Sequence, residues 1–161
     1  MNALKAIYKM SNQTSPDLQL LNIIELNLII RSKSISMSDI YSIEHGFEIE
    51  NEGDLEGASK VFVKLKRRLK LPHLPSICLG VILFKQKRFI DAIAEFSSAI
   101  KLQSELPKAM HDLEDELIAL HNRALCYFRT GDDLLGLADL EKALKINPDH
   151  VIVKDLITHT I

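Results

Sequence analysis

The chain is poor in the residues that make tight turns and crosslinks. Its 161 residues include six glycines, five prolines, two cysteines and no tryptophan. Because turn-rich all-β folds place glycine and proline at their corners, this scarcity argues against such a fold. Two cysteines cannot form a disulfide framework, so we expect a reducing compartment, the cytoplasm, as the location.

The sequence also lacks a strong charge of one sign and a long apolar run. Twenty Lys and Arg oppose 22 Asp and Glu, and the net charge of −2 offers no general attraction for nucleic acid. The most apolar stretch, 18–30, is shorter than the roughly 20 residues that span a bilayer, and it contains Asn22, Glu25 and Asn27. The first residues do not show the pattern of a secretory signal. We therefore expect no nucleic-acid partner and no membrane insertion.

What is present is a repeat of small and large apolar residues. The small residues Gly46 and Ala58 and the large residues Ile49 and Phe62 return 34 residues later as Gly80, Ala92, Leu83 and Phe96. A further 44 residues on, the same positions hold Ala124, Gly136, Tyr127 and Leu140. The longer second offset indicates ten inserted residues between the second and third units. Small residues at these positions would let two helices approach closely, with Phe96 filling the space beside them.

Turn residues lie between the two halves of each unit. Gly53 and Gly131 suit the left-handed conformation that ends a helix, and Asp54 or Asp132 can cap the helix that follows. Pro148 is expected to stop the last strong helix. Each unit is therefore predicted to be a helix–turn–helix.

This pattern resembles the tetratricopeptide repeat (TPR), a helix–turn–helix unit of 34 residues with small and large side chains at fixed positions. Segments 80–99 and 120–148 match these positions closely. The resemblance implies a single all-α domain, a right-handed α-solenoid of three TPR hairpins at 39–72, 73–106 and 117–150. An N-terminal helical segment, 1–38, would precede them, with its main helix at about 16–31. A short capping helix at 151–161 would follow.

The resemblance also implies a binding groove on the concave face, lined by the first helix of each unit. The family's concave positions fall here on eight residues, most of them apolar: Ile43, Phe47, Ile77, Val81, Phe84, His121, Leu125 and Phe128. An apolar surface of this size is either covered or used for contact. We expect a non-catalytic adaptor or chaperone that holds an apolar peptide or helix of a partner protein. The alternative is a groove filled by the chain's own helix 16–31 or by a second copy in a homodimer.

One familiar use of the TPR groove is excluded by the residues present. Some TPR proteins clamp a chaperone's C-terminal carboxylate with Lys and Asn on the first helices, but the matching positions here include Ile43 and Phe47, which cannot donate a hydrogen bond to a carboxylate. Glu50 would repel such a ligand. A weaker resemblance links segment 37–62 to type III secretion translocator chaperones, which hold an apolar segment of their cargo in the groove.

The remaining motifs point to no chemistry of their own. The basic run 64–70, KLKRRLK, is either a phosphate-binding or targeting patch or simply a solvated helix face. Cys78 and Cys126 lie on core-type helices and are expected to pack there. Metal-ligand pairs, phosphate-binding glycine loops and catalytic triad signatures do not occur, so we expect no enzyme, no catalytic residue, no metal and no cofactor.

Overall fold

The computed structural model describes residues 36–69, 73–107 and 113–160. Helices occupy most of these ranges, which contain no β-strand: α3 (Met37–Asn51), α4 (Leu55–Arg68), α5 (His73–Lys85), α6 (Phe89–Glu105), α7 (Leu113–Thr130), α8 (Asp133–Ile146) and α9 (Val151–Thr160). The predicted N-terminal helices lie outside the described residues. The predicted capping helix is present as α9.

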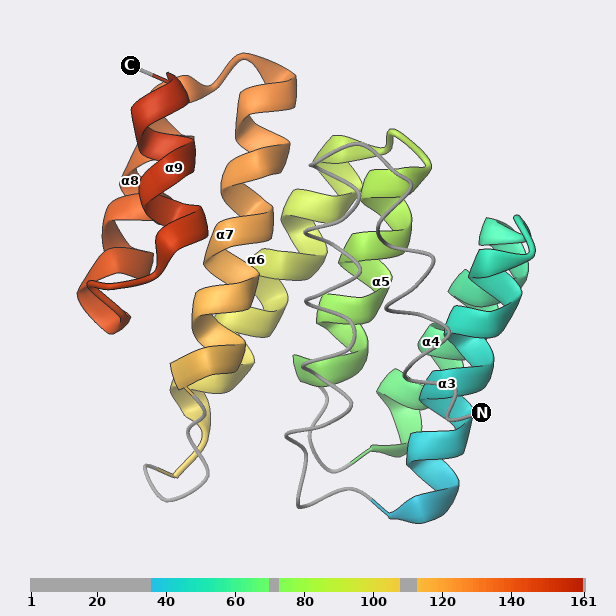
Figure 1. Ribbon diagram of the computed structural model, residues 1–161. Helices are drawn as coiled ribbons and strands as arrows, with labels where there is room; N and C mark the ends of the chain where they lie inside the picture. The colour runs from blue at the N-terminus through green and yellow to red at the C-terminus, as the bar shows by residue number, and fades with distance from the viewer. Residues whose placement is uncertain (1–35, 70–72, 108–112, 161) are drawn as a thin grey trace.

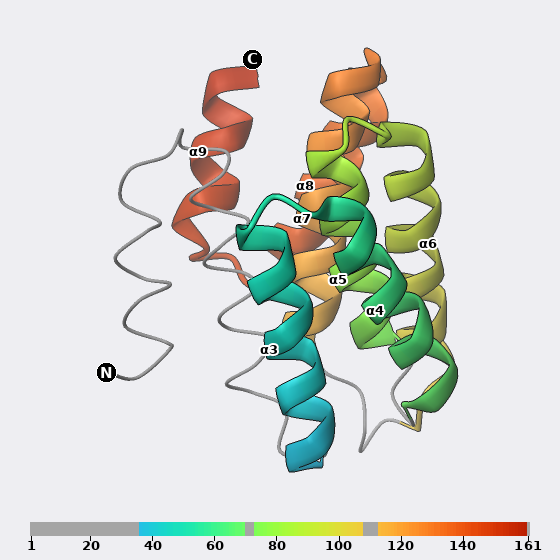
Figure 2. The same ribbon diagram turned by 90° about the vertical axis from the view of Figure 1, so that its right-hand side faces the viewer.

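The helices stack as hairpins in two layers (Figures 1 and 2). Helices α3 and α4, α5 and α6, and α7 and α8 pack in pairs, and the pairs join through α4 with α5 and through α6 with α7. We call α3, α5 and α7 the inner layer, and α4, α6 and α8 the outer layer. The inner face is the side of the inner layer that is turned away from the outer layer. This arrangement confirms the predicted all-α solenoid.

Small residues bring the helices of a hairpin close together, as the repeat predicts. A Cβ atom added to Gly80 on α5 would lie only 2.6 Å from Cε1 of Phe96 on α6. The first hairpin repeats the contact, since a Cβ on Gly46 would lie 2.7 Å from Cζ of Phe62. Both phenylalanines are fully buried. The sequence therefore identifies the central contact of these two hairpins correctly.

Each of the three hairpin turns contains one residue in the left-handed backbone conformation, with a positive φ angle. Gly53 and Gly131 have φ angles of +92° and +83°, as predicted. The middle turn has no glycine, and Lys87 adopts a φ of +60° in its place. A non-glycine residue in this region is uncommon, so the second turn depends on the packing of α5 against α6.

Of the two predicted helix caps, one forms. The Asp54 carboxylate accepts a hydrogen bond from the backbone N–H of Gly57 at 2.8 Å, at the start of α4. Asp132 makes no such bond to α8, and its carboxylate accepts from the Thr130 hydroxyl at 2.8 Å. Helix α8 ends at Ile146, two residues before Pro148.

The core divides into two clusters. The larger one spans α3 to α7, and the smaller one joins α7, α8 and α9. Leu156 on α9 packs against both clusters, and Val153 is fully buried. Cys78 and Cys126 are both buried, as expected. In the described ranges, no helix is long and apolar enough to cross a membrane.

Candidate functional site

Helix α5 is buried around its whole circumference. Each residue from His73 to Phe84 is buried, whereas the outer helix α4 buries only Ala58, Phe62 and Leu65. A helix that packs on one side alone shows a buried stripe and an exposed face. The continuous burial of α5 therefore means that its inner face is covered as well as its outer one.

The structure brings most of the predicted groove residues into one cluster. Six of the eight belong to the larger core cluster, with exposed fractions of 9% or less: Ile43, Phe47, Ile77, Val81, Phe84 and Leu125. His121 is also buried, with 1% exposed. Phe128 is half-buried and packs in the smaller cluster instead. Six of the predicted residues are therefore neighbours in the core, and Phe128 lies apart from them.

All three of the predicted groove phenylalanines contact the outer layer. The Phe47 ring lies 5.1 Å, centroid to centroid, from Phe62 on α4. A Cβ on Gly136 of α8 would lie 2.5 Å from the Phe128 ring. The family positions alone do not reveal this, because a large ring next to a glycine turns into the space that the glycine leaves. These two residues fill their own hairpins.

Phe84 links the second and third hairpins at the turn end of α5. Its ring meets Phe89 edge-on at 5.3 Å between centroids, and the Arg129 guanidinium of α7 lies 5.8 Å from the ring centroid. The second contact has cation–π geometry. Phe84 retains 9% exposure, the most of the six clustered groove residues.

An ion pair crosses the inner layer at the same end. Glu50 at the end of α3 bonds to Lys85 at the end of α5, and their side chains are only 5% and 10% exposed. The lysine is therefore buried as well as neutralised by a carboxylate of its own chain, and this burial further disfavours its use as a clamp for a foreign carboxylate. Sequence analysis treated Glu50 as an unpaired anion. The pair could have been predicted from the sequence, because Glu50 and Lys85 have opposite charges and are 35 residues apart, close to one repeat length.

A second polar pair crosses at the opposite end of α5. His73 Nε2 and Asp115 Oδ2 are 3.0 Å apart, and both side chains are buried. This pair joins the start of α5 to the start of α7. Helix α5 thus has a buried polar pair at each end, and neither pair was predicted from the sequence.

His121 is a neutral side chain on α7. Burial, with a smaller contribution from the charge of His150, lowers the pKa of His121 to about 3. Its Nε2 atom is buried and has no hydrogen-bond partner among the described residues, and the same is true of Oδ1 of the neighbouring Asn122. An uncharged imidazole in this position can hydrogen-bond a peptide group but cannot attract an anion.

The layers are joined by one strong ion pair in the third hairpin. Nε and Nη2 of Arg123 on α7 donate to the two carboxylate oxygens of Asp139 on α8 at 2.6 and 2.7 Å. Nη1 also donates to Ser97 on α6 at 2.9 Å. Burial opposes the charge on Arg123, but its hydrogen bonds and attraction to Asp139 outweigh this and raise its pKa.

The third hairpin carries a recognisable family pattern. Residues 117–150, which cover most of α7 and all of α8, match the family model of the tetratricopeptide repeat. This match, together with the stacked hairpins, supports a TPR-type protein. Repeats of this type form protein–protein interaction modules. No curated protein matches the chain.

No metal centre is evident in the part of the chain that the structure describes. None of its His, Cys, Asp and Glu side chains gather in groups of three or more that could hold a metal ion. Burial also raises the pKa of the Cys126 thiol to about 12, so this cysteine is protonated at neutral pH. The inner face is therefore the candidate functional site, and its chemistry is apolar packing.

Proposed function

We propose that the chain is a non-catalytic adaptor or chaperone that holds an apolar peptide or helix of a partner protein on its inner face. The observation that carries this proposal is the apolar character of α5, which has no charged side chain from Leu74 to Phe84, in a repeat type that forms interaction modules. Among the described helices, α4 and α6 cover the outer side of α5 and α7 lies beside it. No described helix lies over its inner face in Figures 1 and 2. Because α5 is already buried in the isolated chain, a partner segment would pack on this face in place of the chain's own cover.

The chemistry of the face favours an apolar helix or strand as its occupant. Ile77, Val81 and Leu125 supply branched aliphatic surface, and burying such surface is favourable by about 25 cal/mol per Å². The charges at the two ends of α5 are already paired within the chain. Recognition would therefore rest on shape and apolar contact, as when an amphipathic helix binds in a groove.

The same burial favours a second candidate, in which the occupant belongs to the protein itself. The apolar stretch 18–30 within the predicted helix 16–31 leaves little polar surface and needs a cover. Either this helix or a second copy of the chain would then fill the inner face, and the protein would be a structural module. A translocator chaperone in the cytoplasm is a special case of the first candidate, with the cargo's apolar segment as the ligand.

One crosslinking experiment separates these candidates in the full chain. A benzophenone amino acid replaces Phe84 on the inner face, or, as a control, Tyr41 on α3, which is 63% exposed. After illumination in the cells that make the protein, we expect the probe at 84 to join an apolar segment of another protein. Crosslinks to residues 16–31 or to a second copy would instead support the structural module. Because Phe84 contacts Phe89, crosslinks to α6 are expected in every case; the absence of any further product, or the same products from both positions, would refute both candidates.

A further inference from the structure

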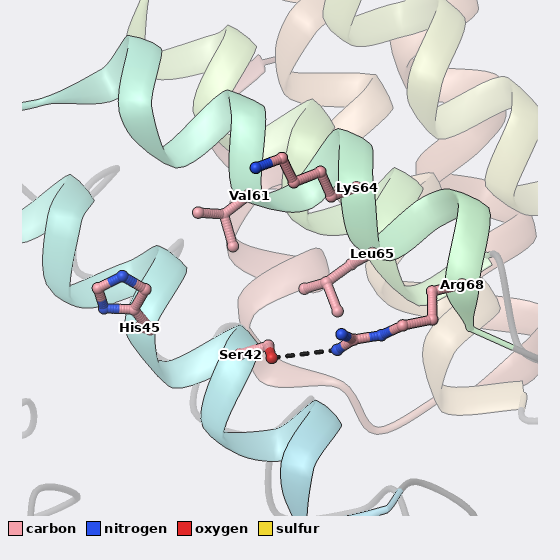
Figure 3. A pocket seen from close by; sticks show the side chains of 6 residues that line it. All are labelled: Ser42, His45, Val61, Lys64, Leu65 and Arg68. Atoms are coloured by element: carbon pink, nitrogen blue, oxygen red, sulfur yellow. Dashed lines mark hydrogen bonds between the residues drawn. The ribbon is translucent and has the colours of Figure 1, made fainter.

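A small pocket lies between α3 and α4, away from the inner face (Figure 3). It has a volume of about 140 Å³ and is lined by Ser42, His45, Val61, Lys64, Leu65 and Arg68. We call it the α3–α4 pocket. It belongs to the hairpin that ends the stack of described helices (Figure 2), where no further described hairpin covers it.

The Arg68 guanidinium is held in place at one edge of this pocket. Its Nη2 donates to Oδ1 of Asp39 at 2.7 Å and to the Ser42 hydroxyl at 3.1 Å. Asp39 is itself fixed by the Ser36 hydroxyl at 2.7 Å. Within the described part of the chain, Nε and Nη1 of Arg68 make no hydrogen bond. The planar guanidinium is therefore preorganised and keeps donors for a ligand.

Lys64 provides a second positive charge at the pocket. Among the described residues it has no acidic partner, whereas Lys66, two residues along the helix, turns away to Glu95 on α6 at 2.8 Å. Arg67 is exposed and does not line the pocket. The basic run 64–70 is therefore not one uniform solvated face, because its side chains reach separate neighbours.

The floor of the pocket is apolar. The buried Leu65 lies between the Lys64 and Arg68 side chains and Val61 lies beside it, with Ser42 and His45 facing them from α3 (Figure 3). A cationic edge beside an apolar floor complements an acidic side chain next to an apolar one. The acidic residues Asp39 and Glu48 lie at the margin, Glu48 within 3.7 Å of His45. They would repel an extended polyanion such as nucleic acid or an anionic membrane.

We propose that the α3–α4 pocket docks an acidic peptide segment of a partner protein. The partner's carboxylate binds Lys64 and Arg68, and the adjoining apolar side chain rests on Val61 and Leu65. A hydrogen bond between an arginine and a carboxylate is stronger than one between neutral groups. The small pocket has room for one acidic and one apolar side chain of the peptide. This docking is independent of the inner face, so the two proposals stand or fall separately.

The test uses the full chain and a labelled peptide with a single acidic residue, acetyl-Ala-Leu-Glu-Leu-Ala-amide, with binding followed by fluorescence anisotropy. We expect saturable binding that weakens about tenfold in Arg68→Gln and in Lys64→Gln, a loss of about 1.4 kcal/mol. The matched control is Arg67→Gln, which makes the same charge change on the same helix and should alter the affinity less than about twofold. A peptide with Gln in place of Glu should also bind the natural chain about tenfold or more weakly, as the acidic peptide does with the two pocket variants.

Circular dichroism checks that each variant keeps its helices. If Arg68→Gln loses structure because its bond to Asp39 is gone, Lys64→Gln decides the question, since Lys64 has no such bond in the described chain. Equal weakening by all three substitutions would contradict the proposal, because it would show diffuse attraction to the basic run. Tighter binding to a DNA oligonucleotide or to phosphatidylserine vesicles than to the peptide would also overturn it.

Discussion

Helices α5 and α4 have nearly the same length but opposite surroundings. The 13-residue α5 buries twelve consecutive residues, whereas the 14-residue α4 buries three. The buried residues of α4, at 58, 62 and 65, follow helical spacing and face the first hairpin and α5. Its other positions carry the basic run and meet solvent. Helix α4 is a surface helix, and α5 is an enclosed one.

This difference explains where the protein can bind and how. An outer helix offers polar side chains around small pockets, as between α3 and α4. An inner helix without a polar face offers only apolar contact, and it must be covered at all times. A partner of the inner face therefore has to provide or replace that cover. The predictions below test the contrast, from the largest expected effect to the smallest.

Breaking a buried ion pair of the outer layer should lower the free energy of unfolding more than breaking an exposed one. Asp139→Asn on α8 leaves the half-buried Arg123 without its charged partner, and removing one member of a buried pair costs about 3 kcal/mol. Asp91→Asn on α6 breaks a pair with Arg88 that is more than half exposed, which should cost less than about 1 kcal/mol. Urea unfolding followed by circular dichroism measures both. Equal losses of unfolding free energy would show that the buried ion pair stabilises the fold no more than the exposed one.

The two helices can be compared with the same substitution. Val81→Ala on α5 removes two methyl groups from a fully buried site and should lower the free energy of unfolding by about 2 kcal/mol. Val63→Ala on α4, at a site 39% exposed, should lower it by no more than about 0.5 kcal/mol. If both variants unfold at the same urea concentration, α5 is no better enclosed than α4.

The enclosure of the inner layer on α7 should appear in the pH dependence of stability. The pKa of His121 is about 3 in the folded chain and about 6.5 when unfolded. Between these values the unfolded chain binds a proton that the folded chain does not, so stability falls as the pH drops below 6.5, by at most about 1.4 kcal/mol per pH unit.

The variant His121→Gln isolates this effect, because it keeps all carboxylates and removes only the imidazole. Urea midpoints measured from pH 7 down to pH 4 should fall more steeply for the natural chain than for the variant. Parallel slopes would mean that His121 takes up its proton in the folded chain and is not enclosed.

Contacts within a repeat could be predicted from the sequence. Gly80 and Phe96 belong to the same unit, so their spacing alone places them opposite each other, and the structure confirms it. Gly53 and Gly131 were recognisable because few other residues accept a positive φ. Even so, the turn at Lys87 shows that packing can impose this conformation without a glycine.

Contacts between repeats were harder to predict. The pairs Glu50 with Lys85 and His73 with Asp115 join residues 35 and 42 positions apart, and their meeting depends on how neighbouring hairpins stack. Phe128 was assigned to the inner face by its family position, yet the space beside Gly136 draws its ring toward α8. The cover of α5 could not be inferred from α5 itself, because a helix that is apolar on all sides does not show which side is open.

The most direct test of the enclosed inner face uses the absence of tryptophan from the natural chain. Phe84→Trp and Tyr41→Trp each create a single fluorescent reporter, one on the inner face and one on the exposed side of α3. In the full chain, the account predicts that the reporter at 84 emits at shorter wavelength and resists quenching by acrylamide, while the reporter at 41 is quenched readily. Equal quenching at the two positions would contradict the enclosure of α5.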